Sequence, residues 1–115
     1  MPAAILQNKK WQSCIDACVC RAEAREFCAA SDLKERDVNW MASCAQINRE
    51  YAVVCWTAAS LISMDSQLSK QFCDLCADFC DACAAECKRH LDVNHCRLCH
   101  QICHECSEEC RKIAI

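Results

Sequence analysis

The sequence of 115 residues predicts an all-α protein, an up-down-up-down antiparallel four-helix bundle with cysteines lining the core. The first observation is that the chain has no glycine and a single proline, so helix breakers are nearly absent. The second is a set of sixteen cysteines, most of which recur at steps of three and four residues, as core positions of a helix bundle do. The third is that clusters of helix-capping residues interrupt the chain at three places.

Those clusters set the expected boundaries of the helices. The segments "SDLKER", "SMDSQ" and "HLDVNH" begin at residues 31, 63 and 90. Short polar side chains in each can accept hydrogen bonds from the first turn of the helix that follows. Because the loops are short, consecutive helices are expected to be antiparallel, and residues 1–115 are expected to form one domain. The predicted N-caps are Ser31 or Asp32, Asp65 or Ser66, and Asp92 or Asn94, and the predicted helices span about residues 5–30, 36–62, 67–90 and 94–113.

The first predicted helix has one stripe that is part cysteine and part arginine. Cys14, Cys18 and Cys28 lie on it, and Arg21 and Arg25 occupy the positions between Cys18 and Cys28. Turning the helix until the arginines reached solvent would also swing the cysteines away from the bundle axis. Inward-facing arginines are therefore predicted, and they would divide this row of cysteines in two.

The other three helices carry the remaining axial cysteines. In the second, Cys44 and Cys55 belong to a stripe that Asn48 and Tyr51 continue. The third and fourth share the pattern C-x2-C-x3-C-x2-C-x3-C and form an internal repeat offset by 23 residues. Larger apolar residues such as Leu75 precede the cysteines by one position, and we expect them to flank the cysteines and complete the core. The repeated cysteines are Cys73, Cys76, Cys80, Cys83 and Cys87, then Cys96, Cys99, Cys103, Cys106 and Cys110.

This spacing of cysteines favours metal binding over disulfides. Side chains three or four residues apart on a helix have Cβ atoms about 5–6 Å apart, whereas a disulfide needs about 3.5–4.5 Å. A soft cation between two sulfurs fits that gap, and thiolates select Cu(I) or zinc. Zinc prefers closed tetrahedral sites built from loops, whereas a ladder of pairs and triplets suits Cu(I), whose single charge neutralises about one thiolate. Cu(I) is the expected ligand, and Zn is the alternative.

Several other classes of protein fit the sequence poorly. The iron–sulfur pattern C-x2-C-x2-C-x3-C-P is absent, and the N-terminal "MPAAILQNKKWQSC" lacks the apolar stretch of a signal peptide, so we expect a cytoplasmic protein with free thiols. With a net charge of −3, no basic stripe and no long apolar run, neither nucleic acid nor membrane is an expected partner. Cysteine can also serve as a small apolar core residue, and that role is expected for Cys20, which lies off the axial stripe.

Two segments, "CDLCADFCDACAAECKRH" (73–90) and "HCRLCHQICHECSEEC" (95–110), resemble the cytosolic branch of the bacterial copper storage proteins. "CIDAC" (14–18) and "CAQINREYAVVCWTAA" (44–59) resemble it more weakly. The resemblance implies a bundle that binds many Cu(I) ions along its axis, forms a homo-tetramer and has no catalytic activity. It also implies that the metal ligands are Cys14, Cys18, Cys28, Cys44, Cys55, Cys73, Cys76, Cys80, Cys83, Cys87, Cys96, Cys99, Cys103, Cys106 and Cys110.

The sequence departs from the family pattern at three axial positions. Arg21, Arg25 and Tyr51 stand where that pattern would place cysteines. A buried arginine stays charged and is costly without a partner. We therefore expect a lower Cu(I) capacity than in relatives with a complete ladder.

Four histidines follow the ladder of the third helix. His90 comes three residues after Cys87 and is predicted to extend the ladder as a metal ligand at the mouth of the bundle, although a solvated helix-end histidine is the alternative. His95 is a weaker candidate, and His100 and His104 are expected to point outward.

The leading functional hypothesis is Cu(I) storage or buffering without catalysis. The first alternative is a thiol redox or signalling module, in which Arg21 and Arg25 lower the pKa of nearby cysteines. The second is a structural helical bundle without a physiological metal.

Overall fold

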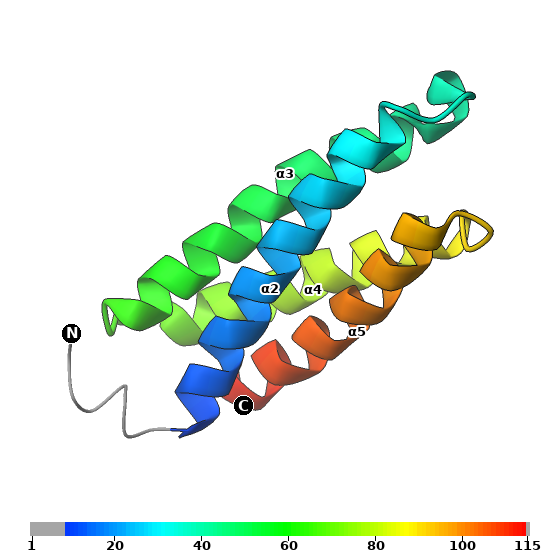
Figure 1. Ribbon diagram of the computed structural model, residues 1–115. Helices are drawn as coiled ribbons and strands as arrows, with labels where there is room; N and C mark the ends of the chain where they lie inside the picture. The colour runs from blue at the N-terminus through cyan, green and yellow to red at the C-terminus, as the bar shows by residue number, and fades with distance from the viewer. Residues whose placement is uncertain (1–8, 115) are drawn as a thin grey trace.

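The computed structural model describes residues 9–114, with side chains described for residues 11–112. This part of the chain forms four helices and no strand: α2 (Lys9–Asp32), α3 (Val38–Ser63), α4 (Ser69–Lys88) and α5 (Asn94–Ala114). Each helix runs back along the one before it (Figure 1). The predicted all-α four-helix fold is confirmed, with helix ends within about two residues of those expected, apart from residues 5–8 of the first helix, which lie outside the described residues.

The turn between α2 and α3 differs from the prediction. Ser31 and Asp32, the expected N-caps, complete the last turn of α2, and the N-cap of α3 is Asp37, whose carboxylate accepts a hydrogen bond from the backbone N–H of Trp40 at 3.1 Å. The Asp32 side chain is instead fully buried. Helix α2 continues through these residues because they are followed by no proline or glycine that would end it earlier.

The turn between α3 and α4 uses both predicted capping residues in a different way. Asp65 has φ of 55°, a left-handed conformation that aspartate tolerates better than most residues in a chain without glycine. Ser66 accepts a hydrogen bond from the backbone N–H of Leu68 at 3.1 Å, while Leu68, at the N-cap position of α4, makes no side-chain cap.

The helices pack as a square around one long axis. Helix α2 contacts α3 and α5, and α4 contacts the same two helices. The molecule is elongated, measuring 48 × 22 × 19 Å. No helix in residues 9–114 combines the length and the apolar character that crossing a membrane requires.

Cysteine and alanine build most of the core. All fifteen axial cysteines are at most 1 % exposed, and buried alanines such as Ala22 and Ala77 lie among them. Of the larger apolar residues that precede the cysteines by one position, Phe72 is partly buried and packs against the core, whereas Leu75 is 45 % exposed. Since cysteine holds the positions facing the axis, a residue one place earlier is turned about 100° around the helix and falls near its outer side. Most of the side chains that face the axis are therefore cysteines.

Candidate metal centre

The axial cysteines form two groups at opposite ends of the bundle. One group lies near the start of α2 and the end of α5, and we call it the eight-thiol cluster. The other lies near the end of α2 and the start of α5, and we call it the seven-thiol cluster. The eight-thiol cluster contains Cys14, Cys18, Cys55, Cys73, Cys76, Cys80, Cys106 and Cys110, and the seven-thiol cluster contains Cys28, Cys44, Cys83, Cys87, Cys96, Cys99 and Cys103.

Sulfur atoms of the eight-thiol cluster lie close enough to share one ion. The Sγ atom of Cys110 is 3.7 Å from those of both Cys14 and Cys18 and 3.9 Å from that of Cys106. The Sγ atoms of Cys14 and Cys73 are 4.0 Å apart. Two sets of four cysteines have all their sulfurs within 4.8 Å of one another: Cys18, Cys76, Cys106 and Cys110, and Cys55, Cys76, Cys80 and Cys106. The sharing of Cys76 and Cys106 between these sets makes the cluster continuous.

The seven-thiol cluster mixes sulfur with oxygen. Cys28, Cys44, Cys96 and the buried carboxylate of Asp32 lie within 4.8 Å of one another. The thiol of Cys96 donates to Asp32 Oδ1 at 3.5 Å, and the Cys28 and Cys96 sulfurs are 3.9 Å apart. Cys83, Cys99 and Cys103 form a further set of three thiols with the same spacing.

Hydrogen bonds within this set of four favour ionisation of Cys96. Hydrogen bonds from Cys28 and Cys44 lower the pKa of Cys96, although the neighbouring Asp32 opposes the effect. Burial raises the pKa of Asp32 above its ordinary value. Because the thiolate is the form that binds metal, the lowered pKa makes it easier for Cys96 to lose its proton when an ion binds.

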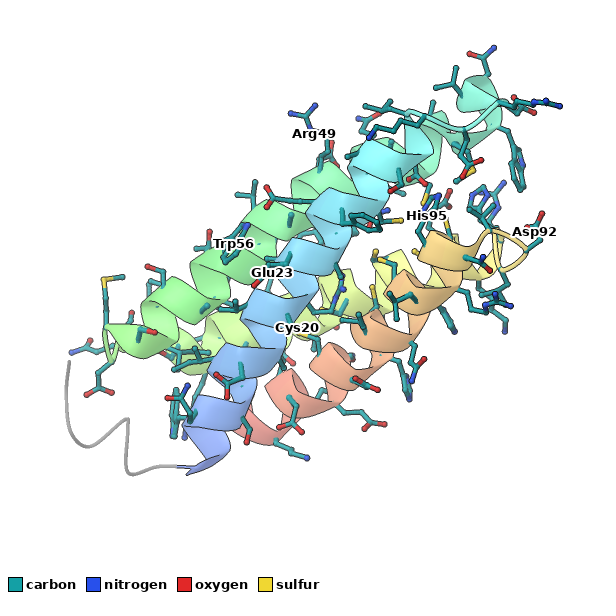
Figure 2. All side chains as sticks on the ribbon, in the orientation of Figure 1. Cys20, Glu23, Arg49, Trp56, Asp92 and His95 are labelled. Carbon is teal, nitrogen blue, oxygen red and sulfur yellow. The ribbon has the colours of Figure 1, made fainter. Side chains whose placement is uncertain are left out.

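The two candidate histidines make different contacts. His95 lies at the start of α5, beside the end of α2 (Figure 2), and its Nδ1 is 3.4 Å from Cys28 Sγ and 3.6 Å from Cys96 Sγ. Its Nε2 is 2.9 Å from Glu35 Oε1. The sequence ranked His95 below His90, which follows Cys87 at a spacing of three residues. The signal for His95 was its position next to Cys96 at the start of a helix.

His90 is buried, and its Nδ1 has no hydrogen-bond partner. Its ring packs edge-on against Trp40 with centroids 4.4 Å apart, and its Nε2 is 3.4 Å from Glu86 Oε1. Among the described residues, the close sets of thiols and carboxylates do not include it. Of the two histidines expected to point outward, His104 is exposed, whereas His100 is half-buried and donates from Nδ1 to the Ala84 carbonyl at 2.7 Å.

Asn48 lies in the middle of the seven-thiol cluster. Its amide nitrogen donates to Cys44 Sγ at 3.3 Å and to Cys28 Sγ at 3.5 Å. Its amide oxygen accepts from Cys99 at 3.3 Å and from Cys83 at 3.4 Å. Sequence reasoning placed Asn48 on the axial stripe but gave it no role, although that position was the signal available.

Two arginines lie on the axis between the clusters, as their spacing predicted. The side chains of Arg21 and Arg25 are both 0 % exposed. Arg25 Nη2 donates to the Phe79 carbonyl at 3.4 Å and to Cys103 Sγ at 3.8 Å, and its guanidinium carbon is 5.2 Å from the centroid of the Tyr51 ring. The structure therefore places a fixed positive charge at the centre of the bundle.

All sixteen cysteines are free thiols, and Cys20 alone among them is exposed. Figure 2 shows Cys20 on α2. It lies off the axis as expected, but because it is exposed the prediction that it serves as an apolar core residue is wrong. The arrangement as a whole can hold several soft cations, each between two to four sulfurs, with neighbouring ions sharing ligands.

Comparison with known proteins places this arrangement in a family. A family model for the copper storage proteins matches residues 7–115. Similar solved structures include the Cu(I)-bound copper storage protein BsCsp3, which is 36 % identical, with a TM-score of 0.87 and coverage of 93 % of this chain and 100 % of that chain. The apo form of copper storage protein 3 from Bacillus subtilis is 36 % identical, with a TM-score of 0.84 and coverage of 90 % and 98 %.

A cytosolic copper storage protein from Streptomyces lividans, in a structure with five coppers, is 29 % identical, with a TM-score of 0.88 and coverage of 92 % of both chains. No match was found among curated protein sequences. The family model covers nearly the whole chain, and the solved structures share its fold along nearly its whole length. The chain belongs to the copper storage protein family.

Proposed function

We propose that this protein stores or buffers Cu(I) by binding many ions to the cysteine thiolates inside its four-helix bundle. The observation that carries the proposal is that fifteen free thiols are buried along one axis in two clusters of closely spaced sulfurs. Membership of the copper storage protein family and the likeness to a Cu(I)-bound structure support it.

The proposed ligands are the fifteen axial cysteines. Within the eight-thiol cluster, Cys76 and Cys106 each belong to two sets of four sulfurs, so neighbouring ions would share them. Shared thiolates suit a monovalent ion, since many divalent ions in the same space would need more negative charge than the thiols can supply. This argument favours Cu(I) over zinc. At the mouth, the contacts of His95 with two thiols favour it over His90 as an additional ligand.

Four further properties belong to the same proposal. The chain acts as one domain in the cytosol, and the free thiols and the cytosolic relative support that location. It has no catalytic activity, because its reactive groups are directed at one another inside the bundle. It assembles into a homo-tetramer, and the exposed apolar side chains of Phe27, Val53 and Trp56 offer surface for contact between copies.

The expected capacity is lower than a complete ladder would give. Arg21, Arg25 and Tyr51 stand at axial positions without adding a sulfur, and the amide of Asn48 takes part of the seven-thiol cluster. Fewer ligands on the same axis hold fewer ions.

Thiol redox signalling is the weaker reading. Redox-sensing cysteines are accessible to the oxidant, whereas each axial cysteine is at most 1 % exposed. Mild oxidation followed by mass measurement separates the two functions, because a redox module would form defined disulfides faster than a model thiol does.

Titration of the reduced protein with Cu(I), in competition with a chelating probe, tests the proposal. Several equivalents should bind tightly, and binding of at most one equivalent would contradict it. Replacing Cys20, the exposed cysteine, by serine should leave the capacity unchanged. Replacing Cys76 and Cys106, which are shared between sets, should lower it.

A further inference from the structure

The two buried arginines lack ordinary anionic partners. None of the ion pairs formed by the described residues involves Arg21 or Arg25. All three side-chain nitrogens of Arg21 are buried without a hydrogen-bond partner, as are Nε and Nη1 of Arg25. A buried charge without compensation is strongly destabilising, so an anion beside these guanidinium groups would stabilise the fold.

The groups beside the arginines that can take a negative charge are cysteine thiols. Arg25 Nη2 contacts Cys103 Sγ at 3.8 Å. Burial by itself lowers the pKa of Arg21, but ionised sulfurs at Cys103 and Cys99 would oppose that effect, and the pKa lies above its ordinary value. The pKa of Arg25 is raised in the same way, with Cys83 as the leading sulfur. The arginines therefore face the thiols that are proposed to bind Cu(I).

The first ions to enter are the ones that most need a positive charge nearby. With thiols in excess, one Cu⁺ forms two Cu–S bonds, two S–H bonds ionise, and two protons pass to the solvent. The product is a bis-thiolate complex with a charge of −1, and no oxidation or reduction occurs. At higher loading, ions share sulfurs, and each added Cu⁺ displaces about one proton, so the charge of the core changes little. The need for a counter-cation is greatest at the start.

Thiols beside the arginines already have the required spacing. With metal–thiolate bonds of about 2.3 Å, the length that zinc makes, a linear sulfur–metal–sulfur unit spans about 4.6 Å. The Sγ atoms of Cys99 and Cys103 are 4.0 Å apart, and both lie within 4.8 Å of Cys83 Sγ. A small side-chain adjustment is enough to admit one ion there.

We propose that Arg21 and Arg25 are built-in counter-cations that direct the first Cu(I) ions to the centre of the bundle, where anionic bis-thiolate complexes form against their guanidinium groups. This rests on the proposed function. A fixed positive charge repels a bare Cu(I) ion, but it attracts the anionic complex that forms when two thiolates of the protein bind that ion. The arginines reduce the total number of ligands and strengthen the first sites.

The test compares Arg21→Leu/Arg25→Leu with the wild-type protein. Leucine removes the charge without adding a ligand, whereas the thioether of methionine could bind Cu(I). Competition with bathocuproine disulfonate should show that the first two equivalents bind at least about tenfold more weakly, since opposite charges about 5 Å apart attract strongly at an effective dielectric constant of about 20. Binding of later equivalents should change much less.

Arg36→Gln/Arg49→Gln is the matched control. It removes the same formal charge from two exposed arginines and should leave the first two affinities unchanged. An equal loss of affinity in this control variant would mean that the net charge of the protein causes the effect, and it would contradict the proposal. If Arg21→Leu/Arg25→Leu bound the first two Cu(I) equivalents as tightly as the wild-type protein, or more tightly, the proposal would also be contradicted. Tighter binding would show that the arginines repel Cu(I).

A second pair of variants keeps the test decisive if the leucine protein fails to fold. Cys99→Ser/Cys103→Ser removes a central pair of thiols, and Cys14→Ser/Cys73→Ser removes a pair with the same separation of 4.0 Å at the end of the bundle. Both should lower total capacity, but only the central pair should weaken the first equivalents. The reverse order would overturn the proposal. Failure of Cu(I) storage itself would appear separately, as binding of at most one equivalent by the wild-type protein.

Discussion

The guanidinium carbon of Arg25 lies 5.2 Å from the centroid of the Tyr51 ring, so two side chains from different helices fill the centre of the bundle without contributing sulfur. The Tyr51 ring also packs against Phe79, with centroids 4.7 Å apart. Together these contacts hold the guanidinium in place between the eight-thiol and the seven-thiol clusters.

Replacing Arg21 and Arg25 by cysteine should raise the Cu(I) capacity by more than one equivalent without unfolding the bundle. Both side chains face the axis, so the new thiols would join sulfurs already present on either side. Removing two buried charges is also not expected to destabilise the fold. Titration to saturation, followed by copper and protein analysis, measures the change. An unchanged capacity would show that the two positions lie outside the metal path.

The metal-free protein should already be helical. Cysteine packs as a small apolar residue, and the core includes alanines and Ile62 in addition to thiols, so burial does not depend on an ion as it does in a zinc finger. Far-UV circular dichroism of the reduced protein in a chelator provides the measurement. A coil spectrum that becomes helical only when Cu(I) is added would show this prediction to be wrong.

Replacing His95 by alanine should slow the uptake of Cu(I) without lowering the final capacity by more than about one equivalent. His95 is partly exposed and contacts both Cys28 and Cys96, so it lies between solvent and the seven-thiol cluster. Stopped-flow transfer of Cu(I) from a chelator measures the rate. His90→Ala is the comparison, because His90 packs on Trp40 instead, and equal slowing in both variants would remove the distinction.

Asp81 should contribute a small, pH-dependent amount to stability. Its partial burial tends to raise its pKa, but hydrogen bonds from Ser107 and Arg111 lower the pKa overall. The ionised carboxylate therefore stabilises the fold above the ordinary pKa of about 3.9, and the contribution disappears as the pH falls through the lower folded value. Because Asp81 is half exposed, Asp81→Asn should cost less than about 1 kcal/mol at pH 7 and a smaller amount at pH 3.

Urea denaturation of the reduced metal-free protein at both pH values checks this prediction. Asp74→Asn is a suitable control, since Asp74 is exposed on the same helix and forms none of the ion pairs described for residues 11–112. A loss that is the same at pH 7 and pH 3 would mean that the charge of Asp81 plays no part.

The regular spacing of the cysteines made the fold predictable. Steps of three and four residues place every axial cysteine on one face of its helix, and the absence of glycine left few ways to break the helices. The prediction did not identify the buried role of Asp32, because a capping residue and a buried acceptor for thiols look the same in a sequence. The structure shows that its carboxylate accepts from Cys96, which links the end of α2 to the start of α5.

The site residues that recur at regular spacing could be predicted from the sequence, whereas those that occur once could not. The axial cysteines and the inward arginines follow from periodicity alone. His95 and Asn48 do not, since their roles depend on which thiols other helices bring near them. Asn48 contacts sulfurs from three other helices as well as from its own, and that convergence is set by packing between helices, not by spacing within one.

The sharing of sulfurs between neighbouring sets has a consequence for how such a protein can evolve. Cys76 and Cys106 each belong to two sets of four thiols, so a point mutation in this core removes one donor and leaves others beside it. Loss of a single cysteine lowers the load without abolishing it. Capacity is therefore a graded trait, which selection can raise or lower one codon at a time. A closed site with four ligands differs, because the loss of one ligand disables the whole site.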